Sequence, residues 1–174
     1  MCTELQGEDI KIADCEHGRR RNMEKTTVLF VCVHNSARSQ MAEAFLRQLG
    51  GCKFEVESAG LEPGEINPLV IDVMREVGID LSSKSTQSVF DLYKKGCLYN
   101  YVITVCDEAN AQKCPLFPGI AVRQSWSLED PTYFAGTYEE RLEKTRKVRD
   151  LIRQNVEKFI AEVAKGGTPG LFAT

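Results

Sequence analysis

Hydrophobic and polar positions along the chain follow two alternating patterns. Short, nearly continuous apolar runs predict buried strands, and longer segments with apolar residues at helical spacing predict helices between them. The strands are predicted at 26–31, 54–58, 100–105 and 121–125, and the helices at 37–49, 67–77, within 82–93 (one or two short ones) and 138–164. Because strands alternate with helices, we expect an α/β fold with a doubly wound, four-stranded parallel sheet flanked by helices.

Residues that favour helix ends sharpen these boundaries. Gly50-Gly51 terminates the first predicted helix, and Asn67 and Pro68 are typical of the cap and first position of the second, which stops at Gly78. The last helix should bury one apolar face against the core. The predicted core face consists of Val148, Leu151, Ile152, Val156, Phe159, Ile160 and Val163.

The periodic pattern is confined to one stretch of the chain, so we predict a single domain over 25–165. Residues 1–24 are polar without clear periodicity and are expected to form a flexible extension, and 166–174 a flexible tail. Cys2, Cys15 and His17 lie in the extension, but their spacing matches no strong zinc pattern. No resident metal is therefore predicted there.

Composition limits the classes of function. Of the 174 residues, 43% are hydrophobic and 27% charged, as in ordinary globular proteins, and the net charge of −3 argues against a general nucleic-acid binder. No apolar stretch is long enough to span a bilayer, and the N-terminus shows no secretory pattern. The seven cysteines are then expected to be reduced thiols in a cytoplasmic protein, some of them cycling in catalysis.

The segment from Cys32 to Ser39 carries the strongest chemical signal. An apolar strand runs into Cys-x5-Arg-Ser, and a helix follows at once. Backbone N–H groups and a helix N-terminus that converge on one point bind anions, and the same field stabilises a thiolate. We therefore predict Cys32 as a nucleophile and an oxyanion site formed by Val33, His34, Asn35, Ser36, Ala37 and Arg38. The alternative is a buried cysteine that packs as a small hydrophobe.

Three further residues fall where the predicted sheet would gather them. Cys106 directly follows the third strand, Cys114 comes after the polar stretch 107–113, and Asp130 lies in Glu129-Asp130-Pro131 after the fourth strand. Because ligands bind at the carboxyl ends of parallel strands, Cys32 and Cys106 should meet at one edge. Asp130 could act as a general acid there. The structural alternatives are a buried strand-end cysteine, a loop thiol without a role and an Asp-Pro turn.

At this point the chain resembles a known family over roughly residues 26–160. One segment is similar to the phosphate-binding loop of the low-molecular-weight protein tyrosine phosphatase fold, namely Val31-Cys32-Val33-His34-Asn35-Ser36-Ala37-Arg38-Ser39-Gln40-Met41-Ala42-Glu43. Two others resemble the redox segment and the acid loop of thioredoxin-coupled arsenate reductases on that fold. They are Val102-Ile103-Thr104-Val105-Cys106-Asp107 with Cys114-Pro115, and Trp126-Ser127-Leu128-Glu129-Asp130-Pro131.

The resemblance implies reduction of arsenate to arsenite, with phosphate or sulfate as analogues of the substrate and no cofactor. In that scheme Cys32 attacks arsenate, Arg38 and the loop hold the oxyanion, Asp130 protonates the departing oxygen, and Ser39 donates a hydrogen bond to the Cys32 sulfur. Cys106 then attacks Cys32 and releases arsenite, Cys114 attacks Cys106, and thioredoxin reduces the Cys106–Cys114 disulfide. Each redox step is thiol–disulfide exchange.

Some members of this family bind potassium near the loop through an asparagine, a glutamate, a serine and an aspartate. Asn35, Glu43 and Ser58 match three of these positions, but the fourth holds Gln87. A neutral ligand weakens the attraction for a cation, so the sequence leaves the potassium site open.

Two other functions remain as alternatives. A low-molecular-weight phosphatase would use Cys32, Arg38 and Asp130 through a cysteinyl-phosphate that water hydrolyses. It would leave Cys106 and Cys114 without a role, although a weak phosphatase side activity is expected of a reductase too. A catalytically silent binding module would retain the loop but not need the cysteine and arginine, and both are present.

Overall fold

The structure, a computed structural model, describes residues 25–166. It contains a four-stranded sheet in the order β2-β1-β3-β4, with every pair of neighbours parallel, which confirms the predicted fold class. The strands are β1 (Thr26–Cys32), β2 (Phe54–Gly60), β3 (Tyr101–Thr104) and β4 (Val122–Ser125). The predicted extension at 1–24, with Cys2, Cys15 and His17, and the predicted tail from 167 onward lie outside the described residues.

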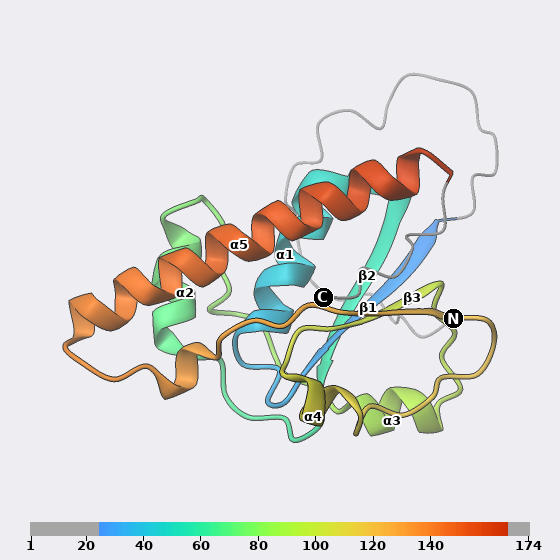
Figure 1. Cartoon of the computed structure of the whole chain (residues 1–174), viewed down its shortest axis with the longest axis horizontal. Coiled ribbons are helices and arrows are strands. Elements are labelled where there is room, and N and C mark those ends of the chain that lie inside the picture. The colour runs from blue at the N-terminus through green and yellow to red at the C-terminus, as the bar shows by residue number, and fades with distance from the viewer. Residues whose placement is uncertain (1–24, 167–174) are drawn as a thin grey trace.

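Helices cover both faces of the sheet (Figure 1). α1 (Arg38–Gly50), α2 (Pro68–Arg75) and α5 (Tyr138–Ala164) pack on one face, and α3 (Val89–Lys94) packs on the other. The region 82–93 thus gives one short helix, not two. Three single-turn elements that the sequence did not predict complete the fold: η1 (Gly51–Lys53), α4 (Glu108–Ala111) and η2 (Pro131–Tyr133). Within residues 25–166, no helix has both the length and the apolar character needed to cross a membrane.

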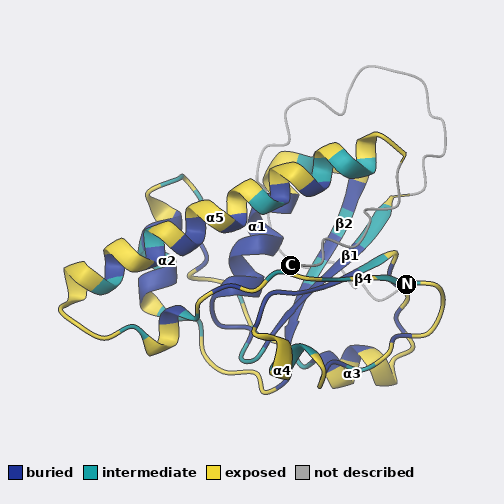
Figure 2. Ribbon diagram, viewed as in Figure 1, coloured by how far each residue is buried: buried dark blue, intermediate teal, exposed yellow. Residues whose placement is uncertain are grey.

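The core consists of two apolar clusters, one on each side of the sheet. Alternate residues of β1 face opposite sides, so Phe30 and Cys32 join the cluster under α1 and α5, and Leu29 and Val31 join the cluster under α3. β1, β2, β3 and the first nine residues of α1 are mostly buried, whereas β4, at the side of the sheet, has no fully buried residue (Figure 2). Cys114 belongs to the α3-side cluster. Cys32 and Cys114 therefore lie on opposite sides of the sheet.

α5 spans the residues predicted for the last helix and begins with a capping box, in which the Thr137 hydroxyl and the Glu140 carboxylate each accept from the other's backbone N–H. One member of its predicted core face was wrong. Leu151 is 45% exposed, whereas Ile152 is fully buried. At 100° per residue, Leu151 is turned away from the centre of the buried stripe, so it sits at the edge that faces solvent.

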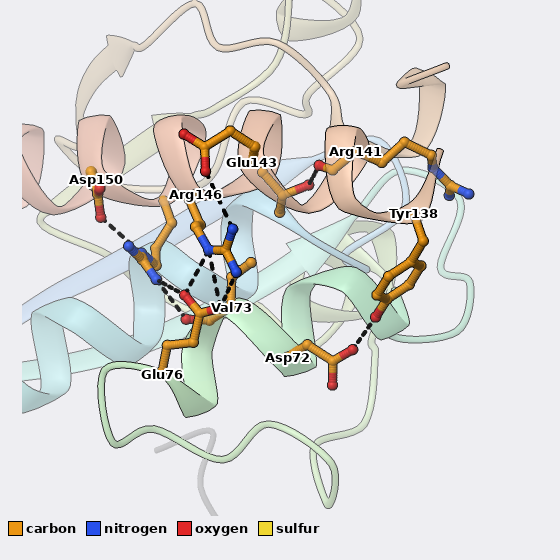
Figure 3. A network of polar contacts seen from close by, with 10 residues as sticks. Asp72, Val73, Glu76, Tyr138, Arg141, Glu143, Arg146 and Asp150 are labelled. Carbon is orange, nitrogen blue, oxygen red and sulfur yellow. Dashed lines mark hydrogen bonds and ion pairs between the residues drawn. The ribbon is translucent and has the colours of Figure 1, made fainter. Parts of the chain in front are cut away.

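A polar network joins α2 to α5 beside the apolar core (Figure 3). The buried Arg149 guanidinium donates from Nη1 to the Val73 carbonyl at 2.8 Å and to the Glu76 carboxylate at 2.9 Å. Arg146 donates from Nη2 to the same carboxylate at 2.7 Å. Tyr138 donates its hydroxyl to Asp72. Glu76 thus holds two arginines of α5 and fixes the position of α2.

Glu76→Gln is expected to lower the free energy of unfolding by about 1 kcal/mol at neutral pH, an amount discounted for the partial exposure of the pair. The hydrogen bond from Arg146, aided by Arg149, lowers the pKa of Glu76 below its ordinary value. The carboxylate therefore contributes stability above the unfolded-state pKa of about 4.3, and this is lost as the pH falls through the lower folded-state pKa.

Denaturant unfolding between about pH 7 and pH 3 measures this difference, which should shrink toward the acid end. Glu143→Gln is the matched control, since Glu143 is exposed and makes one bond, at 3.2 Å, to Arg146. A Glu76→Gln deficit that stayed constant over the whole range would mean that the carboxylate charge is not what stabilises the contact.

Candidate active site

The carboxyl ends of β1 and β3 bring Cys32 and Cys106 to the same edge of the sheet. Val31 is paired with Thr104, and the Val105 N–H donates to the Val31 carbonyl at 2.8 Å. Cys32 is the last residue of β1, and Cys106 lies two residues beyond the end of β3, so the two cysteines are at nearly the same level on neighbouring strands. Cys106 is fully buried, and Cys32 nearly so. This is the juxtaposition that the predicted sheet implied.

The loop after Cys32 turns its carbonyl groups outward. The carbonyl oxygens of Cys32, Val33, His34 and Ser36 accept from the N–H groups of Leu61, Glu62, Gly64 and Asn67, at 3.1, 2.8, 2.9 and 2.9 Å respectively. In a planar trans peptide the carbonyl of one residue and the N–H of the next point in opposite directions. The N–H groups that follow these carbonyls consequently point inward, as an oxyanion site requires.

Gly60, at the end of β2, allows the loop to approach the sheet closely. A Cβ at this position would lie 2.8 Å from the Asn35 nitrogen and the His34 carbonyl carbon, and 2.9 Å from the Val33 oxygen. These are backbone atoms of the loop, so a side chain could be accommodated only by moving the loop. Gly60 and the segment after it thus determine the position of the loop.

The Cys32 sulfur accepts hydrogen bonds inside the loop. The Asn35 N–H donates to Sγ at 3.1 Å, and the Ser39 hydroxyl lies 2.9 Å from it. Asn35 has a φ of 53°, a left-handed conformation that asparagine tolerates better than most residues. Its side-chain Nδ2 donates to the Ser39 oxygen at 2.9 Å, which leaves the hydroxyl hydrogen free to point at Cys32. Donors aimed at sulfur favour the thiolate.

Arg38 links the loop to the segment that carries Asp130. Its Nη1 donates to the Leu128 carbonyl at 2.9 Å, and its Nη2 lies 2.5 Å from Asp130 Oδ2. The other Asp130 oxygen accepts from the Thr132 N–H at 3.0 Å and caps η2. Arg38 Nε is buried without a partner among the described residues. A buried donor of this kind is suited to an anion held in the loop.

Cys106 and Cys114 are free thiols whose surroundings oppose ionisation. Burial raises the pKa of Cys106 to about 11, although the Arg38 guanidinium acts in the opposite direction. Burial also raises the pKa of Cys114. Both Cys32 and Cys114 lie close enough to influence the charge on Cys106.

The residues considered for potassium come together behind the loop, but they do not fit a metal ion. Asn35 Oδ1 already accepts from the Gln40 side chain at 3.3 Å and from the Gln87 N–H at 3.0 Å. Glu43 Oε1 contacts the Lys84 ammonium at 2.6 Å. Its other oxygen, Oε2, accepts from the Ser58 hydroxyl at 2.5 Å. The oxygens that would bind potassium thus already have hydrogen-bond donors, two of which, Lys84 and Arg47, are cations at Glu43 Oε1.

Reasoning from the sequence placed Cys32, Asn35, Arg38, Ser39, Cys106 and Asp130 at this edge, and the structure brings them together. It missed Gln40, Gly60, Lys84 and the Leu128 carbonyl. Gln40 lies inside the loop motif and could have been noticed there. Nothing in the sequence pattern distinguished Lys84 from the other lysines of the chain.

Residues 27–168 match the family model described as low molecular weight phosphotyrosine protein phosphatase. The arsenate reductase of Shouchella clausii (strain KSM-K16) is 40% identical over 138 residues, which cover 79% of this chain and 96% of that protein. A solved arsenate reductase in the oxidized state is 34% identical, with a TM-score of 0.67, and one in the phosphate binding state is 34% identical, with a TM-score of 0.65. Each comparison covers 79% of this chain and 98% of the other.

The family match extends over the whole described domain, including the loop, the segment after β2 that braces it, and the redox and acid segments. Sequence identity and fold agree with one another and with the geometry of the site. The chain therefore belongs to the low molecular weight phosphotyrosine protein phosphatase family, within which it is similar to arsenate reductases.

Proposed function

We propose that this protein reduces arsenate to arsenite through Cys32, Cys106 and Cys114. One observation carries the proposal, namely that Cys106 is a free, fully buried thiol at the end of the strand next to Cys32. An ester hydrolase would have no use for a second thiol there. Relatives at about 40% identity are arsenate reductases, which supports the same substrate.

The first step is attack of the Cys32 thiolate on arsenic. The inward N–H groups of the loop and Arg38 Nε bind the oxyanion, which competes with Asp130 for the guanidinium. Asp130 in its protonated form then gives its proton to an arsenate oxygen, which leaves as water. A sulfur–arsenic bond forms, and arsenic remains in the +5 state.

The second step transfers two electrons. Cys106 attacks the Cys32 sulfur, the sulfur–arsenic bond breaks with its electron pair on arsenic, and arsenite leaves. A Cys32–Cys106 disulfide remains, and Cys106 gives up its proton. Because its raised pKa keeps Cys106 protonated at neutral pH, this thiol does not compete with Cys32 for arsenate.

The third step moves the oxidation outward. Cys114 attacks Cys106, the Cys32 thiolate is released, and a Cys106–Cys114 disulfide forms. Cys114 is buried, but residues 107–113 are exposed or half-buried and Leu116, two residues beyond Cys114, is 73% exposed, so the disulfide forms in a segment that borders solvent. A dithiol protein of the thioredoxin type would supply two electrons per arsenate. Such a cycle needs Cys32, Cys106 and Cys114 as reduced thiols, which favours a location in the cytoplasm. The expectation that all seven cysteines are reduced was wrong, because Cys97 is disulfide-bonded.

Arsenate-dependent NADPH oxidation with thioredoxin and thioredoxin reductase tests the proposal, with para-nitrophenyl phosphate hydrolysis run in parallel. We expect oxidation that falls to background in Cys32→Ser and in Cys106→Ser but persists in Cys52→Ser, since Cys52 is an exposed thiol on η1. Ester hydrolysis that survives Cys106→Ser, with no arsenate turnover in the unaltered protein, would instead identify a phosphatase.

A further inference from the structure

Glu43 is a carboxylate enclosed by the protein behind the active-site loop. It lies on α1, and only 4% of the residue is exposed. A buried carboxylate is costly unless it is paired with a positive charge and hydrogen-bonded. Two cations meet that need at the same oxygen. Arg47 Nε lies 2.9 Å from Oε1, and Lys84 Nζ lies 2.6 Å from it.

A continuous chain of hydrogen bonds leads from Glu43 to the nucleophile. The Ser58 hydroxyl donates to Glu43 at 2.5 Å, and Asn35 Nδ2 donates to the Ser58 oxygen and to the Ser39 oxygen, at 2.9 Å each. Ser39 then contacts the Cys32 sulfur at 2.9 Å. Each donor has its direction set by the acceptor before it. The Glu43 carboxylate thus helps to hold Ser58, Asn35 and Ser39 in the arrangement that directs the Ser39 hydroxyl at Cys32.

Lys84 differs from Arg47 in what it connects. Arg47 sits one turn from Glu43 on the same helix, whereas Lys84 comes from the segment before α3. The other residues of this segment also bind the loop region. The Ser85 carbonyl accepts from Gln40, the Thr86 hydroxyl donates to the Gly64 carbonyl, and the Gln87 N–H donates to Asn35 Oδ1. Lys84 therefore anchors one end of the segment 84–87, which is hydrogen-bonded to the back of the loop region.

We propose that the Lys84 ammonium takes the place of a bound monovalent cation and is a positioning residue for Cys32. It neutralises Glu43 at the site where Asn35, Ser58 and Glu43 would otherwise offer oxygens to potassium, and it keeps the hydrogen-bond chain aligned. The cation behind the loop is thus a side chain of the protein itself, and Cys32 is reactive without added potassium. This inference rests on Cys32 being the nucleophile proposed above.

The test compares Lys84→Met, Lys84→Arg and the control Lys147→Met in about 0.1 M potassium chloride and in choline chloride at the same ionic strength. Lys147 is exposed on α5 and makes no ion pair within residues 25–166. The readout is the rate at which iodoacetamide alkylates Cys32, identified by peptide mass spectrometry. The thermal midpoint of each variant is measured in the same two salts.

In choline, Lys84→Met is expected to slow the alkylation of Cys32 roughly ten-fold, since a ten-fold change in rate corresponds to about 1.4 kcal/mol. Potassium should restore much of that rate and raise the midpoint in Lys84→Met alone. Lys84→Arg and Lys147→Met should behave as the unaltered protein, which should respond to neither salt. A Lys84→Met rate equal to that of the unaltered protein would overturn the inference, as would a slowed rate that potassium leaves unchanged.

Labelling of Cys52 in the same samples separates this inference from the proposed function. Cys52 is exposed and distant in sequence from the loop, so it reports ordinary thiol reactivity. If Cys32 of the unaltered protein reacted no faster than Cys52 near neutral pH, Cys32 would not be an activated nucleophile, and both proposals would fall. If Cys32 is fast and indifferent to Lys84, only the role of Lys84 is wrong.

Discussion

Cys114→Ser is expected to release one arsenite per chain and then stop. In the proposed cycle, Cys32 and Cys106 carry out the chemistry on arsenic. Both remain in this variant, so the first turnover should proceed at a normal rate. Continued turnover should fall by on the order of 10³-fold or more, as when one member of a catalytic unit is removed. Rapid mixing with arsenate, followed by arsenite quantification, distinguishes the burst from steady turnover.

The stall follows from burial of the first disulfide. Cys106 is fully buried and Cys32 nearly so, and a dithiol carried on a protein surface, as in thioredoxin, cannot reach either sulfur in this conformation, whereas a small reagent can enter slowly. Cys114 packs in the α3-side cluster, and the segment 107–113 links it to Cys106. Only an internal thiol on that segment can take over the oxidation and carry it toward solvent.

The state of the stalled protein provides the decisive control. Peptide mapping of Cys114→Ser after arsenate treatment should find Cys32 joined to Cys106, and a small reductant such as dithiothreitol should restart turnover slowly. Cys52→Ser should turn over normally, because Cys52 lies on η1 away from this edge. Sustained turnover of Cys114→Ser with thioredoxin would contradict the three-cysteine scheme.

Local signals in the sequence predicted most of the fold. Asn67 caps α2 through a hydrogen bond to the Leu69 N–H and is followed by Pro68, and α5 spans the predicted range from Tyr138 to Ala164. Apolar runs predicted all four strands to within about two residues at each end. These features depend on a residue and its near neighbours, so a periodic pattern reveals them.

The parts of the site that the sequence did not predict depend on contacts between distant segments. Lys84 is 41 residues from Glu43, and the Leu128 carbonyl is 90 residues from Arg38. The short elements α4 and η2 directly follow Asp107 and Asp130, whose side chains cap them. A pattern of apolar positions indicates which face of an element is buried. It does not indicate which polar side chains of other segments meet there.

The sheet topology brings Cys106 and Arg38 to their places in the site, which the pattern of apolar positions does not reveal. Parallel pairing of β1 with β3 places Cys32 and Cys106 at one edge although 74 residues, the difference of their numbers, separate them. The same edge receives the acid segment after β4, because β4 pairs parallel to β3. Once the strand order β2-β1-β3-β4 is known, most of the proposed machinery is placed.

Arg38→Lys is expected to lower the rate of arsenate reduction by about 10²–10³-fold, the loss typical of removing a donor that stabilises a developing oxyanion. Each guanidinium nitrogen of Arg38 has a different role. Nη1 binds the Leu128 carbonyl, Nη2 binds Asp130, and Nε is left to bind the anion. A lysine has a single ammonium on a flexible stem and cannot span these positions in one geometry. Phosphate, as a competitive inhibitor, should also bind more weakly.

Single-turnover arsenite formation and phosphate inhibition measure the two effects of Arg38→Lys, and circular dichroism establishes that the variant is folded. Arg153→Lys is the matched control, since Arg153 lies exposed on α5 and pairs with Glu157 at 3.0 Å. If Arg38 acted only through its charge, both the single-turnover rate and the strength of phosphate inhibition would stay close to those of the unaltered protein, because lysine keeps the charge. Loss of rate with charge retained would show that the planar, forked geometry of Arg38 is what joins the loop to the acid segment and the substrate.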